Sequence, residues 1–247
     1  MTIPMSVPPP AVFLDFDGTV SRCDVVDAVL TAYAGDAWLE VEAQWQAGAI
    51  GSRECLREQM SLVRASRQQI DSLLDDVEID AGFVPLLETC ARRGMPVHIV
   101  SDGFDYFIHR ILQRCGPDAS RHMLDTQIYA SHLSSSETGE WLVDFQFPAN
   151  VCEHGCATCK PWAMQHLNPD RLPAIFVGDG LSDRYAARGA DVVFAKTGLA
   201  AFCVDQKIPH HRYDDLADVA AQIDDMLRTA SSAVLPNRSS RKVGARQ

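Results

Sequence analysis

One short stretch, Ala11 to Val20, constrains the fold of this chain more than any other. Four apolar residues run directly into Asp15 and Asp17, and Gly18 follows. A short apolar run that ends in a turn signal is typical of a buried parallel strand. Residues two apart in a strand share a face, so the two carboxyl groups leave the strand end close together. Burying both without compensation costs on the order of several kcal/mol, so the pattern indicates a bound cation rather than a solvated acidic turn.

Three further apolar runs, over residues 96–100, 173–177 and 190–195, predict more buried strands. Helical patterns separate these runs, and strands that alternate with helices favour an α/β fold with a doubly wound parallel sheet. Residues 126–133 and 141–147 alternate loosely around a Ser-rich and Gly-containing segment, which predicts a hairpin-like pair.

The chain shows apolar residues at helical spacing, and no strand pattern, between the first and second predicted strands. We therefore expect a helical cap domain over residues 21–79, inserted into a catalytic core formed by residues 11–20 and 80–230. Within this cap, Trp38 and Trp45 are predicted to be core residues rather than part of a ligand cage.

Composition limits the possible partners and location. The net charge of −11 argues against nucleic acid or an anionic membrane as the main partner. The chain has no run of 18 apolar residues and no basic, apolar leader, so we expect no membrane span, a cytoplasmic location and eight reduced cysteines. Residues 1–10 and 231–247 are predicted to be disordered. The sequence does not decide whether the chain forms a homodimer.

Polar residues follow two of the other predicted strands. Ser101 and Asp102 come after the run at 96–100, and Asp179 and Asp183 come after the run at 173–177. Because parallel strands bring their carboxyl ends to one edge of a sheet, these residues can converge with the first acidic pair. Lys160 begins a predicted helix between them. Carboxylate oxygens in such a cluster favour Mg²⁺, which binds beside substrate phosphate.

The ordered set of segments resembles the four motifs of the haloacid dehalogenase superfamily. Asp15-Phe16-Asp17-Gly18-Thr19 is similar to the first motif and Ser101 to the second; Lys160 is similar to the third, and the stretch from Gly178 to Asp183 to the fourth. The resemblance implies that Asp15 attacks phosphorus and forms an aspartyl-phosphate, while Asp17 acts as general acid and then base. An acid two residues after the nucleophile points to phosphate chemistry rather than dehalogenation.

The same resemblance implies binding roles for the remaining motif residues. Phosphoryl oxygens would be held by Ser101, Asp102, Gly103 and Lys160. Mg²⁺ would be bound by Asp15, by the backbone carbonyl of Asp17 and by Asp179, with Asp183 completing this metal site or orienting Lys160.

A helical cap between the first two motifs resembles the phosphoserine phosphatase-like subgroup. Asp24 aligns with a Glu at the start of that cap, and Gln59 aligns with its carboxylate-binding Arg; both are predicted to contact substrate. A Gln offers no charged fork to a carboxylate, which argues against phosphoserine.

The cysteine-containing stretch from Cys152 to Pro161 narrows the resemblance further. It is similar to phosphatases that act on 2-hydroxy-3-keto-5-methylthiopentenyl-1-phosphate in methionine salvage, and to phosphoethanolamine/phosphocholine phosphatases. We expect a Mg²⁺-dependent phosphatase for a small phosphorylated metabolite, with the methionine-salvage compound first. The alternatives are phosphoserine or an amine phosphate as substrate, a phosphoryl-transfer mutase, or a binding protein that keeps the fold without turnover.

The cysteine cluster also leaves two interpretations open. Cys152, Cys156 and Cys159 are predicted to be reduced thiols that position the loop leading to Lys160. The alternative is a structural zinc site that includes His154, although zinc sites normally use two separated ligand pairs.

Overall fold

The computed structural model describes residues 8–136, 138–146, 148 and 152–233. Its centre is a seven-stranded sheet with the order β4-β3-β2-β1-β5-β6-β7, in which every neighbouring pair is parallel except β3 and β4. The strands are β1 (Ala11–Leu14), β2 (Val97–Phe104), β3 (Ile128–Ser135), β4 (Trp141–Asp144), β5 (Ala174–Gly178), β6 (Val192–Ala195) and β7 (His211–Arg212). The predicted α/β fold with a doubly wound parallel sheet is confirmed.

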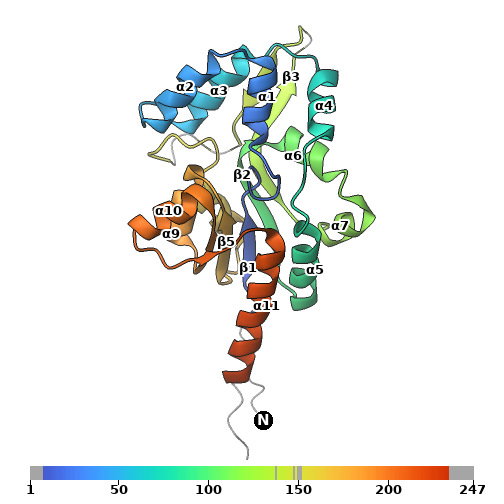
Figure 1. Cartoon of the computed structure of the whole chain (residues 1–247), viewed down its shortest axis with the longest axis vertical. Coiled ribbons are helices and arrows are strands. Elements are labelled where there is room, and N and C mark those ends of the chain that lie inside the picture. The colour runs from blue at the N-terminus through green and yellow to red at the C-terminus, as the bar shows by residue number, and fades with distance from the viewer. Residues whose placement is uncertain (1–7, 137, 147, 149–151, 234–247) are drawn as a thin grey trace, which may run out of the picture.

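Helices cover both faces of this sheet (Figure 1). One face carries α5 (Phe83–Arg93), α6 (Asp105–Leu112), α7 (Gly116–His122) and α11 (Leu216–Ala233). The other carries α8 (Lys160–Leu167), α9 (Arg184–Gly189) and α10 (Thr197–Asp205). Strand β1 therefore contributes to two cores, because alternate side chains point to opposite faces: Val12 and Leu14 join one cluster, and Ala11 and Phe13 the other.

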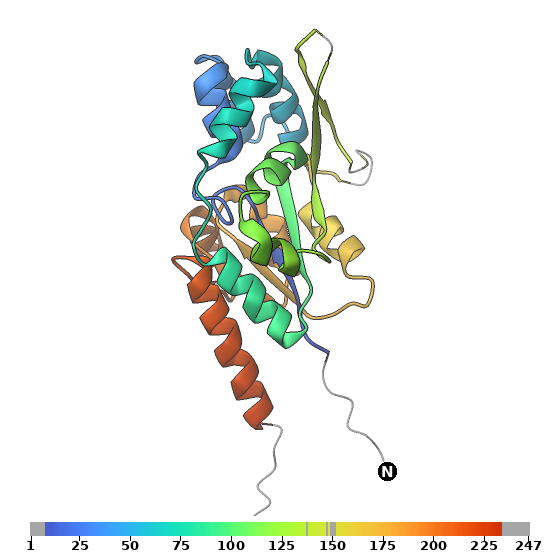
Figure 2. The ribbon, with the colours of Figure 1, turned by 90° about the vertical axis from the view of Figure 1, so that its right-hand side faces the viewer.

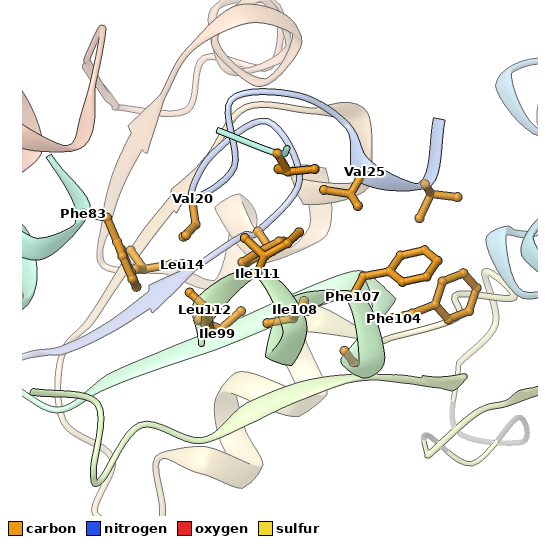
Figure 3. Close-up of a cluster of buried hydrophobic side chains, with 14 of the residues drawn as sticks. Leu14, Val20, Val25, Phe83, Ile99, Phe104, Phe107, Ile108, Ile111 and Leu112 are labelled. Carbon is orange, nitrogen blue, oxygen red and sulfur yellow. The ribbon is translucent and has the colours of Figure 1, made fainter. Parts of the chain in front are cut away.

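The larger core fixes the strand end from which the first acidic pair emerges. Figure 3 shows Leu14 and Ile99, on neighbouring strands, in the same buried cluster as Ile108, Ile111 and Leu112 of α6. All five side chains are at least 97% buried. Fully burying a side chain of this size stabilises the fold by about 1.5–3 kcal/mol, so this packing makes the end of β1 a rigid support.

Four cap helices lie over the carboxyl edge of the sheet (Figures 1 and 2). They are α1 (Val25–Tyr33), α2 (Trp38–Gln46), α3 (Ser52–Leu62) and α4 (Arg67–Asp75). The two chain segments that connect them to the core run side by side: Ser21 pairs with Ile79, and the Asp80 N–H donates to the Val20 carbonyl at 2.9 Å. Such a narrow double connection is suited to a hinge.

The predicted hairpin is confirmed as the antiparallel pair β3 and β4. It extends beyond the sheet and rises beside the cap in Figure 2. The Trp141 indole N–H donates to the Ala65 carbonyl at 3.0 Å, between α3 and α4. The hairpin therefore supports the cap from one side.

Several predicted boundaries differ from the observed ones. Strand β2 continues to Phe104 instead of ending at Val100, because its pairing with β3 shifts register and resumes at Phe104 with Ser131. The helix that follows, α6, accordingly begins only at Asp105. The two-residue strand β7 was not predicted, since His211–Arg212 is too short to show a pattern.

The predicted disordered ends mostly lie outside the described residues. Of these ends, the structure describes residues 8–10 and residues 231–233, which belong to α11. No helix in the described part of the chain combines the length and apolar character needed to cross a membrane.

Candidate active site

The acidic pair lies at the point where the strand order reverses. Strand β1 has β2 on one side and β5 on the other, and Asp15 follows it directly, with its N–H donating to the Val177 carbonyl at 2.9 Å. Open α/β sheets bind ligands at the carboxyl ends of strands at such a position. The motif residues that follow these strands therefore meet at the carboxyl end of β1.

Lys160 ties three of the motif segments together. Its Nζ donates to Asp15 Oδ1 at 2.7 Å, to Asp183 Oδ1 at 2.6 Å and to Ser182 Oγ at 3.2 Å, and the residue is only 2% exposed. Burial alone favours the neutral amine, but the carboxylates of Asp15 and Asp183 raise the Lys160 pKa above its ordinary value. The side chain is therefore a buried ammonium aimed at the strand end.

Asp17 is held by donors from the second motif and from the cap. Ser101 Oγ donates to its Oδ2 at 3.2 Å, and the Val25 N–H donates to its Oδ1 at 3.0 Å. Burial, reinforced by the charge of Asp24, raises the Asp17 pKa to about 7. A carboxyl group of this pKa is suited to giving up and taking back a proton near neutrality.

Gly103 leaves room for that carboxyl group. A Cβ at this position would lie 2.5 Å from Asp17 Oδ2, and the Gly103 N–H donates to Ser101 Oγ at 2.9 Å. Any side chain here would displace Asp17. Gly103, which the sequence analysis predicts to bind phosphate, therefore has a packing role beside Asp17.

Three carboxylates form a group that fits a divalent cation. Each of Asp15, Asp179 and Asp183 offers an oxygen, and these atoms all lie within 4.8 Å of one another; this is the only such group of three or more in the described part of the chain. Burial, followed by the charge of Asp183, raises the Asp15 pKa, as expected for acids crowded without a cation. Hard oxygen donors of this kind suit Mg²⁺.

Asp183 also organises the fourth motif. Its Oδ2 accepts the N–H groups of Asp179 at 2.9 Å and Gly180 at 3.1 Å, while its Oδ1 accepts from Lys160. Both oxygens therefore have protein donors. This arrangement orients Asp179 and Lys160, which is one of the two roles expected from the sequence.

The Asp102 carboxylate has protein partners at both oxygens. Ser52 Oγ donates to Oδ2 at 3.0 Å, and the Thr158 N–H donates to Oδ1 at 3.1 Å. An anionic side chain engaged in this way is poorly placed to bind a phosphoryl oxygen. The hydrogen bond from Ser52 to Asp102 could not be predicted from the sequence, because a Ser at the start of a helix gives no indication of a distant partner.

A cavity of about 210 Å³ joins the strand end to the cap. On the cap side it is lined by Asp24, Asp27, Glu42, Trp45 and Gln59. The prediction that Trp45 is a cap core residue is wrong, because the indole is only half-buried and borders this cavity; Trp38 is buried as predicted. Neither Asp27 nor Glu42 was predicted from the sequence.

The cap side of the cavity is acidic. Gln59 is 2% exposed, and its Nε2 donates to Glu42 Oε2 at 3.0 Å. Burial, with the charges of Asp24 and Glu42, raises the Asp27 pKa to about 7. No Lys or Arg is among the described residues that line the cavity, so its charge complements a neutral or cationic group.

The cysteine loop leads into α8, and its described residues form no group of three or more side chains placed to hold a metal ion. Cys152, Cys156 and Cys159 are all half-buried. Burial raises the pKa values of the Cys156 and Cys159 thiols, with Asp102 adding to the effect at Cys156 and Cys152 adding to it at Cys159, which disfavours a nucleophilic thiolate at these two positions. The pKa of Cys152 is lowered instead, because backbone N–H groups of Cys156 and His154 donate to its sulfur and outweigh its burial. His154 stacks on Tyr185, with ring centroids 4.3 Å apart.

We expect replacement of Cys152, Cys156 and Cys159 by Ser to lower stability more than it lowers turnover per folded molecule. The thiols would then support the loop and take no part in chemistry. Thermal unfolding and active-fraction kinetics measure the two effects. Metal analysis of the purified protein decides the zinc alternative: one tightly held equivalent of zinc would overturn the assignment as reduced thiols.

Two relatives that match most of this chain share one name. The 2-hydroxy-3-keto-5-methylthiopentenyl-1-phosphate phosphatase of Bacillus pumilus is 27% identical over 220 residues, covering 87% of this chain and 91% of that protein. The protein of the same name from an Exiguobacterium species is 28% identical over 214 residues, covering 85% and 95%.

The fold likeness extends to solved structures. A phosphoserine phosphatase captured as a phospho-aspartyl intermediate analogue matches with a TM-score of 0.65 at 18% identity, covering 87% of this chain and 98% of that one. The family model for haloacid dehalogenase-like hydrolases matches residues 12–188, a span that contains all four motifs. The chain therefore belongs to the haloacid dehalogenase-like hydrolases.

Proposed function

We propose that this hydrolase is a Mg²⁺-dependent phosphomonoesterase that acts through an aspartyl-phosphate. One observation carries the proposal. The buried Asp15 carboxylate contacts the Lys160 ammonium, while Asp17, two residues on, borders the same cavity with a pKa raised to about 7. A nucleophile, an acid and a cation at one strand end are what hydrolysis of a phosphate ester requires.

The reaction follows from the roles of these side chains. A free oxygen of Asp15 attacks phosphorus, the bond from phosphorus to the leaving oxygen breaks, and Asp17 gives its proton to that oxygen. Water then attacks the aspartyl-phosphate while Asp17 takes a proton from it, which releases phosphate and restores the Asp15 carboxylate. Lys160 and the Ser101 hydroxyl, which contact Asp15 and Asp17, would stabilise the phosphoryl oxygens as their charge shifts.

Mg²⁺ would be held by Asp15, Asp179 and the backbone carbonyl of Asp17, with Asp183 as orienting residue or further ligand. The ion supplies positive charge that offsets repulsion between the carboxylate nucleophile and the anionic phosphoryl group.

We expect a chelator to abolish turnover and added Mg²⁺ to restore it. Binding of Mg²⁺ to the folded form alone also raises the unfolding temperature as its concentration increases. Steady-state assays and thermal unfolding across a Mg²⁺ series measure both effects. Full activity in chelator without added metal would contradict the proposal.

For the substrate, we propose 2-hydroxy-3-keto-5-methylthiopentenyl-1-phosphate first. The name of the two relatives supports this choice, and so do the side chains of the cavity. Val26, Leu56 and Trp45 offer apolar surface for a methylthio tail. The compound's leaving group carries no carboxylate that would be repelled by the acidic wall of the cavity, which is formed by Asp24, Asp27 and Glu42.

An amino-alcohol phosphate is the second candidate, and the acidic wall favours it. Asp24, Asp27 and Glu42 would attract an ammonium, and the indole of Trp45 can contact a cation through its ring face. Phosphoserine fits less well, because its carboxylate would face these acids without a charged partner.

A panel of four substrates tests the assignment: the methionine-salvage compound, phosphoethanolamine, phosphocholine and phosphoserine. We expect the highest kcat/KM for the first and the lowest for phosphoserine. Phosphoserine is phosphoethanolamine with an added carboxylate, so this pair isolates the effect of charge. A missing charge-assisted contact of about 1.5–3 kcal/mol predicts roughly a 10- to 100-fold preference for phosphoethanolamine within the pair.

Two results would change the assignment. If phosphoserine is the best substrate, the alignment of Gln59 is wrong. If an amine phosphate is best, Asp24 and the acidic wall select the substrate. In that case Glu42→Gln should lower kcat/KM for the amine phosphate. The control Glu140→Gln changes an exposed residue in the turn between β3 and β4, outside the cavity lining, and should not lower it.

A further inference from the structure

The loop that leads to Lys160 touches the cap backbone to backbone. The Arg53 N–H, in the first turn of α3, donates to the Gly155 carbonyl at 3.0 Å. Gly51 lies so near that a Cβ on it would be 2.5 Å from the Gly155 oxygen. The start of α3 and the loop therefore fit each other closely. In Figure 1 the loop lies below α2 and α3.

One hydroxyl connects this contact to the second motif. Ser52 Oγ accepts the Ala157 N–H at 2.8 Å and donates to Asp102 Oδ2 at 3.0 Å. The other Asp102 oxygen accepts the Thr158 N–H at 3.1 Å. Three segments far apart in sequence, the cap helix, strand β2 and the loop, thus meet at Ser52 and Asp102.

The hydrogen bonds at Ala157 and Thr158 hold the backbone immediately before Lys160. Thr158 precedes Lys160 by two residues, and Lys160 begins α8 with its ammonium on Asp15. If the cap swings away on its double connection, Ser52 and Arg53 must leave the loop. Of these hydrogen bonds, the loop then keeps only the one from the Thr158 N–H to Asp102.

We propose that Ser52 and Asp102 are positioning residues that couple closure of the cap to the placement of Lys160. With the cap closed, Ser52 holds the Ala157 N–H and Asp102 holds the Thr158 N–H, so the backbone that leads into α8 is restricted to one conformation. With the cap open, the loop loosens and Lys160 is less firmly held against Asp15. This inference rests on the proposed function for its catalytic consequence, but the coupling itself is a property of the folded chain.

The test compares Ser52→Ala with a matched change on the same helix, Ser61→Ala. Ser61 is exposed, and its hydroxyl donates to the Glu58 carbonyl of the same helix. Hydrogen exchange is measured at the Ala157 and Thr158 amides, and inorganic phosphate with Mg²⁺ serves as the binding probe. We expect Ser52→Ala to speed exchange and weaken phosphate binding, each by about tenfold, the scale of one hydrogen bond to a charged group. Ser61→Ala should change neither.

Kinetics and a conservative variant separate positioning from general stability. Ser52→Ala should lower kcat/KM about tenfold, mainly through KM, at an unchanged fold by circular dichroism. Ser52→Thr retains the hydroxyl and should restore exchange, phosphate binding and kcat/KM. If Ser52→Ala does not fold, Asp102→Asn, which cannot accept both bonds, should give the same exchange and phosphate-binding changes.

Each outcome decides a separate statement. Unchanged exchange in Ser52→Ala, or exchange that rises with phosphate binding unaltered, overturns the coupling. Faster exchange with weaker phosphate binding, in a protein that hydrolyses no phosphomonoester, supports the coupling and contradicts the proposed function instead.

Discussion

Asp15→Asn is expected to abolish turnover while the protein stays folded. The amide is a poor nucleophile, and replacing a catalytic nucleophile in other hydrolases lowers kcat by at least about 10⁴-fold. The fold should tolerate the change because the side chain keeps its shape and Lys160 can still donate to the amide oxygen. The substitution also removes the Asp15 carboxylate, whose own pKa is raised by its burial and by the charge of Asp183, and so relieves crowding among the acids.

An exposed Asp provides the control for this experiment. Asp170→Asn makes the same chemical change at a surface turn, and its activity should match that of the unchanged protein. Thermal unfolding confirms that both variants are folded. Steady-state activity of Asp15→Asn above background, after deamidation is excluded by mass spectrometry, would refute the assignment of the nucleophile.

Lys160→Met should have the second largest effect, and it should appear in both activity and stability. Losing one preorganised donor to the phosphoryl group lowers kcat by about 10²–10³-fold. The change also leaves Asp15 and Asp183 buried without their cation, which costs about 3–5 kcal/mol of the free energy of unfolding in metal-free protein.

Added Mg²⁺ should recover part of that stability, because the proposed site for the ion includes the same carboxylates. Lys207→Met, at an exposed position, should change neither quantity. Denaturant unfolding in chelator and in Mg²⁺ measures the difference. If Lys160→Met is as stable as Lys207→Met in chelator, the buried ion pairs do not hold the motif segments together.

The convergence of the motif residues could be predicted because it depends on strand ends. Parallel strands share one carboxyl edge, so apolar runs ending in Asp15, Ser101 and Asp179 define a common site without knowledge of the packing. Lys160 could be placed there only through the family resemblance. Its contacts with Asp15 and Asp183 span 145 and 23 residues of sequence, beyond the reach of any local pattern.

The cap was harder to predict in detail. Its helices could be recognised from their periodicity, but their rotation against the core decides which residues face the cavity. Glu42 and Asp27 look like ordinary exposed acids in sequence, and Trp45 looks like a core residue. The bonds of Ser52 depend on the docking of α3 against a loop about a hundred residues away, so no pattern around Ser52 could reveal them.

Trapping the covalent intermediate tests the central claim most directly. The protein is mixed with Mg²⁺ and a radiolabelled phosphomonoester that it hydrolyses, quenched in acid during turnover and digested. The account predicts one labelled peptide, containing Asp15, whose phosphoryl group is released by hydroxylamine as expected for an acyl phosphate. Turnover that leaves Asp15 unlabelled under these conditions, or label on a cysteine of the loop before α8, would contradict it.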